Sequence, residues 1–464
     1  MRLLPFNFEP IGMDTVFISN TGGFSEYLSR EYLGELICGG STSDDDLNQR
    51  LLSKLFIADT TSYTTAELAL ASSTSKRLTS ELHFNPIFMI VPTLRCDHTC
   101  SYCQVSRANE AAHGFDLDVE LIPKIISQIK ALGRPPYKIE LQGGEPLLCF
   151  DVIENIYLNS ERILGNDSFE LVIASTLSLL NDDILAWAKS RNVHFSTSLD
   201  GTEIVHNKNR ILSTNDSYIR LKKGIELVQT TIGQDRVSTV TTVTGELLKA
   251  PENILQAHCE LGLPNLFVRP ISPYGFAKKD QDNEYSIPQY MAFYERLFDA
   301  ILELWKRGKA VIEYSAAIHL KRVFNPGFNS YSDLKSPSGV LLNSFLFNYD
   351  GRIYGSDELR MIQRIHKDQD FSLGHIEAPE VTKTLYSQII SSSFNQVLPG
   401  CNTCAYQPFC GADPCNEISL QGEYIGDKTR SRFCSYHKEM FTFLLNRWFR
   451  CSESQSMLKE WLYA

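Results

Sequence analysis

From residue 86 onward, short apolar segments with the composition of β-strands alternate with segments of helical periodicity. The strand-like segments are PIFMIVPTL (86–94), KIEL (138–141), FELVIA (169–174), VHFSTSL (193–199), VSTVTTV (237–243) and NLFV (265–268). Helical patterns separate them, among them 119–132, 182–189 and 218–228. Alternation of this kind predicts an α/β fold with a parallel sheet. In (β/α) barrels the reactive residues follow the C-terminal ends of the strands, and we expect them there.

The segments on either side of this region have a different character. VFIS (16–19) and Gly22-Gly23 predict a hairpin followed by short helices, and the Ser/Thr-rich stretch 58–80 predicts a loop or linker. Beyond about residue 330 the alternation fades into loops and clustered cysteines, before a final amphipathic helix at 439–449. We therefore expect three domains: a small α+β domain at 1–85, a barrel at 86–325, and a cysteine-rich domain at 326–464.

Composition excludes several classes of protein. Hydrophobic residues make up 43% and charged residues 21% of the 464, which is typical of a globular protein. No apolar run is long enough to cross a bilayer, and MRLLPFNFEP does not resemble a signal peptide, so we expect a cytoplasmic protein without a membrane partner. The net charge of −11 argues against nucleic-acid binding.

Twelve cysteines in such a chain indicate metal binding rather than disulfides. Three of them, Cys96, Cys100 and Cys103, follow the first barrel strand with the spacing Cys-x3-Cys-x2-Cys. Three thiolates can hold three irons of a four-iron cluster and leave the fourth iron open for S-adenosylmethionine (SAM). The alternative is structural zinc, which usually takes four ligands with paired spacings.

These features resemble a known family. The cysteine spacing, the preceding strand and Tyr102 match the radical SAM signature. LQGGEPLL (141–148) and TSLDGTEIVHNKNR (197–210) resemble the radical SAM peptide-modifying family that includes anaerobic sulfatase-maturating enzymes and carries a C-terminal SPASM domain. The resemblance implies a partial (β/α)6-type barrel, and an enzyme that reductively cleaves SAM to a 5′-deoxyadenosyl radical.

The resemblance also implies roles for individual residues. A SAM molecule would be bound by Tyr102, Gly143, Gly144, Glu145, Ser198 and Arg210, with Glu145 accepting a hydrogen bond from the SAM ammonium. Gln142 would lie near the substrate, and Asp357 would take a proton from it. The alternative, which is slightly favoured, is that Asp357 is a solvated loop residue. Arg269 ends a strand on the reactive side. One departure from the family is Ser175-Thr176-Leu177, where a Thr-Asn-Gly run is common.

A second cysteine group lies near the C-terminus. It resembles the SPASM pattern, which implies that one auxiliary [4Fe–4S] cluster is ligated by Cys401, Cys404, Cys410 and Cys434. Four thiolates also suit structural zinc, which is the alternative. The family holds a second auxiliary cluster, but here Ser356 stands where a ligand cysteine would be, so we predict that this cluster is absent. Cys415 has no assigned role.

Two segments narrow the resemblance further. LRCDHTCSYCQVSR and CAYQPFCGADP resemble the B-component radical SAM maturase of the His-Xaa-Ser peptide system. This implies a precursor peptide or small protein as substrate, a second radical SAM maturase as a possible partner, and a low-potential electron donor. The alternatives are a sulfatase-maturating enzyme and a non-catalytic cluster-bearing scaffold. Residues 1–85 could bind the leader of the precursor, or could be a packing extension.

Overall fold

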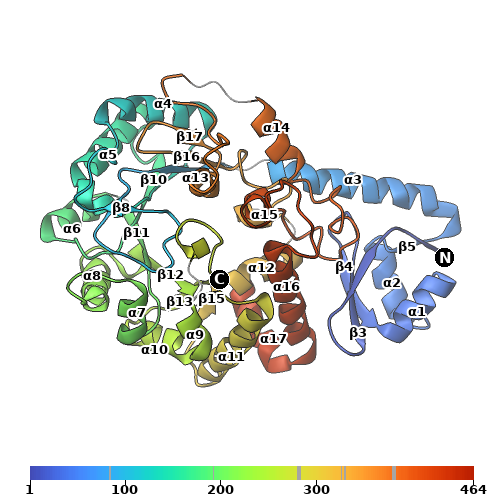
Figure 1. Cartoon of the computed structure of the whole chain (residues 1–464). Helices are drawn as coiled ribbons and strands as arrows, with labels where there is room; N and C mark the ends of the chain where they lie inside the picture. Colours follow the sequence, from blue (N-terminus) through green and yellow to red (C-terminus); the bar gives the residue numbers. More distant parts are fainter. Residues whose placement is uncertain are drawn as a thin grey trace.

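Six parallel strands form the centre of the computed structural model (Figure 1). They are β6 (Ile87–Ile90), β9 (Tyr137–Leu141), β10 (Phe169–Ala174), β11 (Val193–Ser198), β12 (Val237–Val243) and β14 (Val268–Pro270). Their order in the sheet follows the order in the chain, as expected of a (β/α)6 unit. The structure describes residues 1–82, 85–191, 193–279, 284–325, 327–328, 331–378 and 383–463.

Helices cover the outer face of these strands (Figure 1). They are α4 (Ile122–Leu132), α5 (Phe150–Leu164), α6 (Asp182–Lys189), α7 (Glu203–Asn209), α8 (Ser217–Thr231), α9 (Gly245–Lys249), α10 (Glu252–Glu260) and α11 (Ile287–Lys306). In α4 the buried residues Ile122, Ile125, Ile126 and Ile129 lie three or four positions apart, so one face packs on the sheet. The α/β fold predicted from the alternation is confirmed.

Two strands from beyond residue 326 extend the same sheet. β16 (Ser344–Phe347) pairs in parallel with β6, and β17 (Ile353–Tyr354) pairs antiparallel with β16. The last predicted barrel strand is divided: β13 (Asn265–Leu266) pairs with β15 (Ile312–Glu313), and only β14 joins the main sheet. A short parallel pair, β7 (Arg95–Cys96) and β8 (Ala108–Asn109), lies in the cysteine loop.

The C-terminal region combines helices with long loops. Its helices are α12 (Tyr314–Phe324), α13 (Asp357–Gln363), α14 (Lys383–Ser391), α15 (Pro414–Gln421), α16 (Arg432–Arg450) and α17 (Ser452–Tyr463). The amphipathic helix predicted at 439–449 is the second half of α16. Among the described residues, no helix combines the length and apolar character needed to cross a membrane.

The N-terminal region is α+β. A three-stranded antiparallel sheet runs in the order β2 (Asn7–Pro10), β3 (Thr15–Ser19) and β4 (Ser25–Ser29), and the predicted hairpin is β3–β4. Helices α1 (Arg30–Gly39) and α2 (Asp45–Ser53) follow, and β1 (Arg2–Leu3) pairs with β5 (Ile57–Ala58).

The prediction of a loop at 58–80 is wrong, because α3 spans Tyr63–Leu82. Ser and Thr residues usually favour loops since their hydroxyls compete for backbone groups. Here Ser73 and Thr74 donate instead to the carbonyls of Ala69 and Leu70, four residues earlier, so the hydroxyls are satisfied within the helix. The alanines and leucines interspersed among them are good helix formers.

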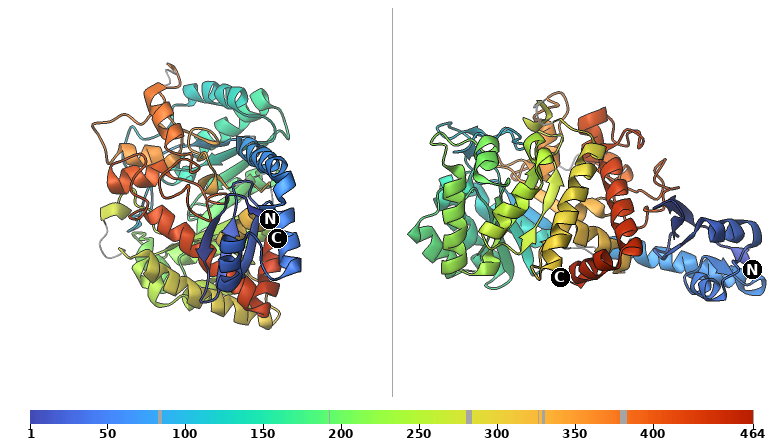
Figure 2. Two further views of the ribbon diagram at one scale, coloured as in Figure 1. Left: turned by 90° about the vertical axis from the view of Figure 1, so that its right-hand side faces the viewer. Right: turned by 90° about the horizontal axis from the view of Figure 1, so that it is seen from below.

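The N-terminal sheet packs on the cysteine-rich C-terminal loop. Phe17 of β3 stacks on Tyr406 with ring centroids 5.7 Å apart, and it also contacts Phe409. Asn7 donates a hydrogen bond of 3.1 Å to the Asn402 carbonyl. Figure 2 shows this domain projecting from the end of the molecule where α16 lies.

Candidate active site

A cavity of about 530 Å³ opens inside the partial barrel. Because side chains alternate along a strand, every second residue points inward. The cavity is lined by Met89 from β6, Glu140 from β9, Gln142 just after β9, Ser196 and Ser198 from β11, and Arg269 from β14. The cavity is also lined by most of the predicted site residues, namely Cys96, Cys100, Tyr102, Cys103, Gln142, Gly143, Gly144, Ser198, Arg210 and Asp357.

The Gly-Gly-Glu turn after β9 holds the cysteine loop in place through two backbone hydrogen bonds. Gly144 N–H donates to the Thr93 carbonyl at 2.9 Å, and Glu145 N–H donates to the Arg95 carbonyl at 2.7 Å. A Cβ on Gly144 would lie 2.0 Å from the Arg95 oxygen, so only glycine fits there. The absence of side chains at this turn therefore allows close approach of the backbone segment that leads into Cys96.

Glu145 is fully buried and does not line the cavity. Its carboxylate accepts hydrogen bonds from Leu147 N–H, from Thr176 N–H and hydroxyl, and from the Ser175 hydroxyl, at 2.7–3.0 Å. Burial, with a contribution from Asp97, raises the pKa of this carboxyl. The unusual Ser175-Thr176 pair thus supplies three of the donors that hold Glu145.

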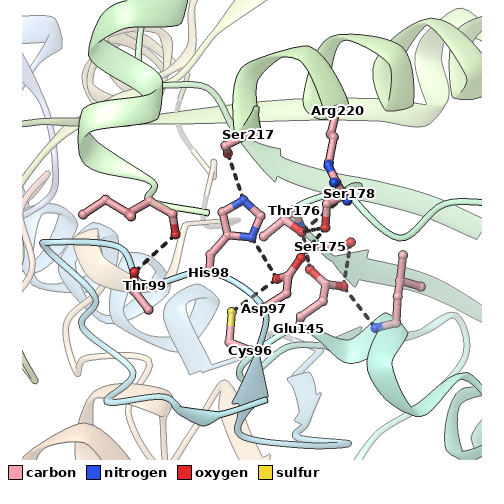
Figure 3. A network of polar contacts seen from close by, with 12 residues as sticks. Cys96, Asp97, His98, Thr99, Glu145, Ser175, Thr176, Ser178, Ser217 and Arg220 are labelled. Atoms are coloured by element: carbon pink, nitrogen blue, oxygen red, sulfur yellow. Dashed lines mark hydrogen bonds and ion pairs between the residues drawn. The ribbon is translucent and has the colours of Figure 1, made fainter. Parts of the chain in front are cut away.

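A chain of polar contacts lies behind the first cysteine (Figure 3). Asp97 contacts the Cys96 thiol and accepts a hydrogen bond of 2.8 Å from His98 Nδ1. His98 Nε2 lies 2.8 Å from the Ser217 hydroxyl, and Ser217 lies 3.2 Å from His206 Nε2. Burial acts to raise the pKa of Asp97, but the hydrogen bond and charge of His98 and the hydrogen bond from Ser178 together outweigh it, so the pKa is lowered.

Tyr102 and Arg210 meet at a fully buried carboxylate, Asp200. Tyr102 OH donates to Asp200, and Arg210 Nε lies 3.1 Å from both the Tyr102 oxygen and the Asp200 carboxylate. Asp200 follows β11, in the Leu-Asp-Gly turn of the motif at 197–210. This contact fixes the side chains of two predicted SAM-binding residues at the cavity surface.

Four of the C-terminal cysteines lie near enough for their charges to act on one another. Burial raises the pKa of the Cys410 thiol, and Cys404, Cys434 and Cys401 raise it further. Cys401, Cys404 and Cys410 lie in one loop, and Cys434 is in the first turn of α16. Cys415 lies apart from them, with its sulfur 3.9 Å from the Ser356 hydroxyl. Ser356 stands where the family would have a ligand cysteine for the second auxiliary cluster. Its hydroxyl therefore lies beside the thiol of Cys415.

All twelve cysteines are free thiols. Within the described residues, no three His, Cys, Asp or Glu side chains lie close enough to share one metal ion. A four-iron cluster does not need such convergence, because each thiolate binds a different iron.

Sequence reasoning missed Asp97, His98, Asp200, His206 and Ser217. Asp97 and His98 stand between ligand cysteines and Asp200 stands inside a family motif, so their positions could have singled them out. His206 lies in the same motif as Asp200 and could have been found in the same way, whereas Ser217 gave no signal, since its partner His98 is more than 100 residues away.

Comparison with known proteins agrees with this geometry. Residues 90–257 match the model of the Radical SAM superfamily, so the chain contains a radical SAM domain. An uncharacterised protein of Methanothermobacter thermautotrophicus is 26% identical over 222 residues, which cover 46% of this chain and 79% of the relative.

Two solved structures share the fold. One is anSMEcpe with bound AdoMet (TM-score 0.64, 16% identity), for which the match covers 81% of this chain and 100% of that one. The other is Streptococcus suis SuiB bound to its precursor peptide SuiA (TM-score 0.53, 16% identity), for which it covers 92% and 99%. The similarity to both extends well beyond the radical SAM domain, into the N-terminal or C-terminal regions.

Proposed function

We propose that this chain is a radical SAM enzyme that modifies a ribosomally made peptide or small protein. The observation that carries the proposal is the placement of Cys96, Cys100 and Cys103 in the same cavity, at the C-terminal ends of parallel strands, in a domain that matches the Radical SAM superfamily. Open-ended barrels of this kind admit substrate at that end.

The residues present fit a [4Fe–4S] cluster at this site. Three unpaired thiols lie on one loop, and burial raises the pKa of the Cys96 thiol and that of Cys100, the latter to about 11. Both thiols would release a proton on binding iron. When bound, the cluster and SAM together supply a 5′-deoxyadenosyl radical. Tyr102, Ser198 and Arg210 would orient SAM, and the Gly143-Gly144 turn would hold the cysteine loop in place.

The second cysteine group fits one auxiliary cluster. Cys401, Cys404, Cys410 and Cys434 provide four thiolates, which close a cluster to substrate and favour electron transfer or a structural role. Ser356 beside Cys415 supports the proposal that a second auxiliary cluster is absent, because a serine hydroxyl and one thiol make a poor ligand pair.

A peptide substrate is supported by the fold shared with SuiB, which was solved with its precursor peptide. We propose the His-Xaa-Ser precursor as substrate, because the motifs around Cys96 and Cys404 resemble those of the maturase of that system. Its modification would require a low-potential electron donor and could involve a second radical SAM maturase. Iron–sulfur clusters need reduced cysteine thiols as ligands, and thiols stay reduced in the cytoplasm. We therefore propose that the protein is cytoplasmic. Asp357 and Gln142 line the cavity as candidate proton acceptor and substrate contact.

The test replaces Cys96, Cys100 and Cys103 together with alanine. The wild-type enzyme should hold about eight irons per chain after anaerobic reconstitution, and the variant about four, with no reductive cleavage of SAM to 5′-deoxyadenosine. Iron analysis and chromatography of the products measure both. The matched control is Cys38→Ala, which removes an exposed, isolated thiol and should change neither value.

Several outcomes would contradict the proposal. Twelve irons in the wild type would show that Ser356 does not mark a lost cluster, and zinc in the isolated protein would favour the structural-zinc alternative. If the cluster-loaded wild type does not cleave SAM, the enzyme proposal is wrong, and the protein is better explained as a non-catalytic cluster-bearing scaffold. Incubation with a His-Xaa-Ser peptide and with a sulfatase-derived peptide, followed by mass spectrometry, separates the two enzyme classes.

A further inference from the structure

One side of the cavity, formed by α13, α15 and the loop around Tyr274, is rich in carboxylates. Asp357 and Glu358 begin α13, and Asp413 is the N-cap of α15. Asp333 and Glu140 line the same cavity. In the part of the chain that the structure describes, none of these five carboxylates forms an ion pair within 4.0 Å. We call Asp357, Glu358, Asp413, Asn416 and Tyr274 the acidic wall.

Two polar groups of the acidic wall have no hydrogen-bond partner among the described residues. They are the Asn416 Oδ1 and the Tyr274 hydroxyl, and these residues are only 8% and 4% exposed. An unpaired buried polar atom costs on the order of 1–3 kcal/mol. An amide oxygen can only accept a hydrogen bond, so the missing partner of Asn416 must be a donor.

The cations of the cavity do not neutralise this wall. Arg210 is paired with Asp200, and Arg432 donates to the Tyr285 carbonyl and lies over its ring. Burial raises the pKa of Glu140 and of Asp333, and Arg269 acts to lower both. Arg360 does not line the cavity, and within the wall it acts on Asp357.

The charged groups that most affect Glu358 are all acidic, namely Asp357, Asp333 and Asp413. Those that most affect Tyr274 are Asp413, Cys415, Glu358 and Asp357. The favourable contacts of Asp413 come from its own helix, where it accepts from Cys415 N–H and Asn416 N–H.

We propose that the acidic wall is a subsite for a cationic side chain of the peptide substrate. An ammonium, guanidinium or imidazolium brings both the positive charge and the N–H donors that the wall lacks. A metal ion does not suit it, since no three His, Cys, Asp or Glu groups among the described residues converge on one point. The inference rests on the proposed function, because it places a peptide in this cavity.

The raised pKa values of two wall carboxyls, Asp413 and Glu358, fit a site that binds either a proton or a substrate cation. Burial, together with the charges of Asp333 and Glu417, raises the pKa of Asp413 to about 7 against the lowering effect of the two backbone donors. Burial likewise raises the pKa of Glu358, with Asp357, Asp333 and Asp413 adding to the effect. With its pKa near 7, Asp413 is mostly protonated at pH 6 and mostly ionised at pH 8, so a cation beside it competes with protons at the lower pH. Affinity for a lysine side chain, which stays charged throughout, should rise with pH.

The experiment measures binding of labelled nine-residue peptides to the anaerobic, SAM-loaded holoenzyme by fluorescence anisotropy. The peptides are three repeats of Xaa-Gly-Ser, with lysine, arginine, histidine or glutamine at Xaa. At pH 8 the lysine or arginine peptide should bind at least about tenfold more tightly than the glutamine peptide. The histidine peptide should bind like the glutamine peptide at pH 8, where the imidazole is neutral, and should gain only a small preference near pH 6, where the imidazole is charged but Asp413 is mostly protonated.

The double variant Glu358→Gln and Asp413→Asn removes two charges while keeping side-chain shape and, at Asp413, an acceptor for the helix cap. It should reduce the preference for lysine over glutamine to about twofold or less, with SAM affinity and iron content unchanged. The matched control is Glu377→Gln, an exposed carboxylate paired with Lys124 and absent from the cavity lining, which should keep the full preference.

Equal binding of the lysine and glutamine peptides would overturn the subsite, and so would a preference that survives the double variant. A loss of SAM affinity in the double variant would assign the wall to the sulfonium and ammonium of SAM instead. If the double variant loses iron, the single Glu358→Gln variant replaces it. SAM cleavage is measured separately: cleavage without a lysine preference refutes only the subsite, and a preference without cleavage refutes only the proposed function.

Discussion

Glu145 acts on the cavity through the loop that it holds. It has no exposed surface, and its carboxylate accepts from Ser175 and Thr176, whose other atoms line the cavity. In Glu145→Gln an amide nitrogen would face the N–H and hydroxyl donors of Ser175 and Thr176, so the loop that carries these residues would lose its anchor. The dissociation constant for SAM should therefore rise about tenfold, roughly 1.4 kcal/mol. Iron content should change little. Isothermal titration with SAM and iron analysis of the same preparation measure the two effects.

Glu313→Gln provides a matched control for this prediction. Glu313 is also fully buried, and it accepts four hydrogen bonds, from Val268 N–H, Ser315 N–H, Ala316 N–H and the Tyr294 hydroxyl. It does not line the cavity. Both variants should lose thermal stability, but only Glu145→Gln should lose SAM affinity. Equal SAM affinity in the two variants would make Glu145 purely structural.

At the scale of elements, the Gly143-Gly144 turn fixes the loop that carries Cys96. Since a Cβ at position 144 would meet the Arg95 carbonyl at 2.0 Å, Gly144→Ala must displace the backbone just before that cysteine. We expect the variant to hold about four irons per chain instead of about eight, with the auxiliary cluster retained. Iron analysis and electron paramagnetic resonance of the reduced protein measure this loss.

The control for the turn is Gly34→Ala in α1, where an added Cβ meets nothing within 4 Å. Alanine is a better helix former than glycine, so iron content should be unchanged and stability equal or higher. Eight irons in Gly144→Ala would contradict the bracing role of the turn.

Elements with a strong local signal were predictable from the sequence. The strand at 169–174 and the helix at 182–189 have the predicted bounds, because apolar alternation and an N-terminal cap are encoded within each segment. Helix α3 was not predictable in the same way, since its hydroxyls are satisfied only once the helix exists. The addition of β16 beside β6 depends on pairing between residues more than 250 positions apart, which a local pattern does not encode.

The same distinction applies to the site. Cys96, Gly144 and Arg210 belong to motifs with fixed spacing, and the cavity contains all three. The contact from His98 through Ser217 to His206, and the acidic wall between α13 and α15, arise only from tertiary packing. Sequence reasoning named Asp357 from the family resemblance but neither Glu358 nor Asp413, because an acidic residue at the start of a helix carries no functional pattern of its own.

At the scale of the whole molecule, the N-terminal domain has two sheet edges that differ in their capacity to bind a peptide strand. The register of β3 and β4 turns the Tyr27 amide toward the open edge of β4, where it donates to Glu26 at 3.1 Å. Glu26 is itself held by Arg50 and Lys54, so this edge is capped. On β2, the register turns the main-chain groups of Phe8 outward, and its side chain is 49% exposed. The open edge is therefore β2.

We predict that a precursor leader adds a strand at β2, with main-chain hydrogen bonds to Phe8. Phe8→Pro removes the outward amide and should weaken precursor binding about tenfold or more, while Phe8→Ala keeps the amide and should bind within about threefold of the wild type. Both variants should retain about eight irons and unproductive SAM cleavage. Deleting residues 1–80 is a poorer test, because it strips Phe17 from Tyr406 in the auxiliary cysteine loop. Equal precursor affinity in Phe8→Pro and Phe8→Ala would instead make the domain a packing extension that covers this loop.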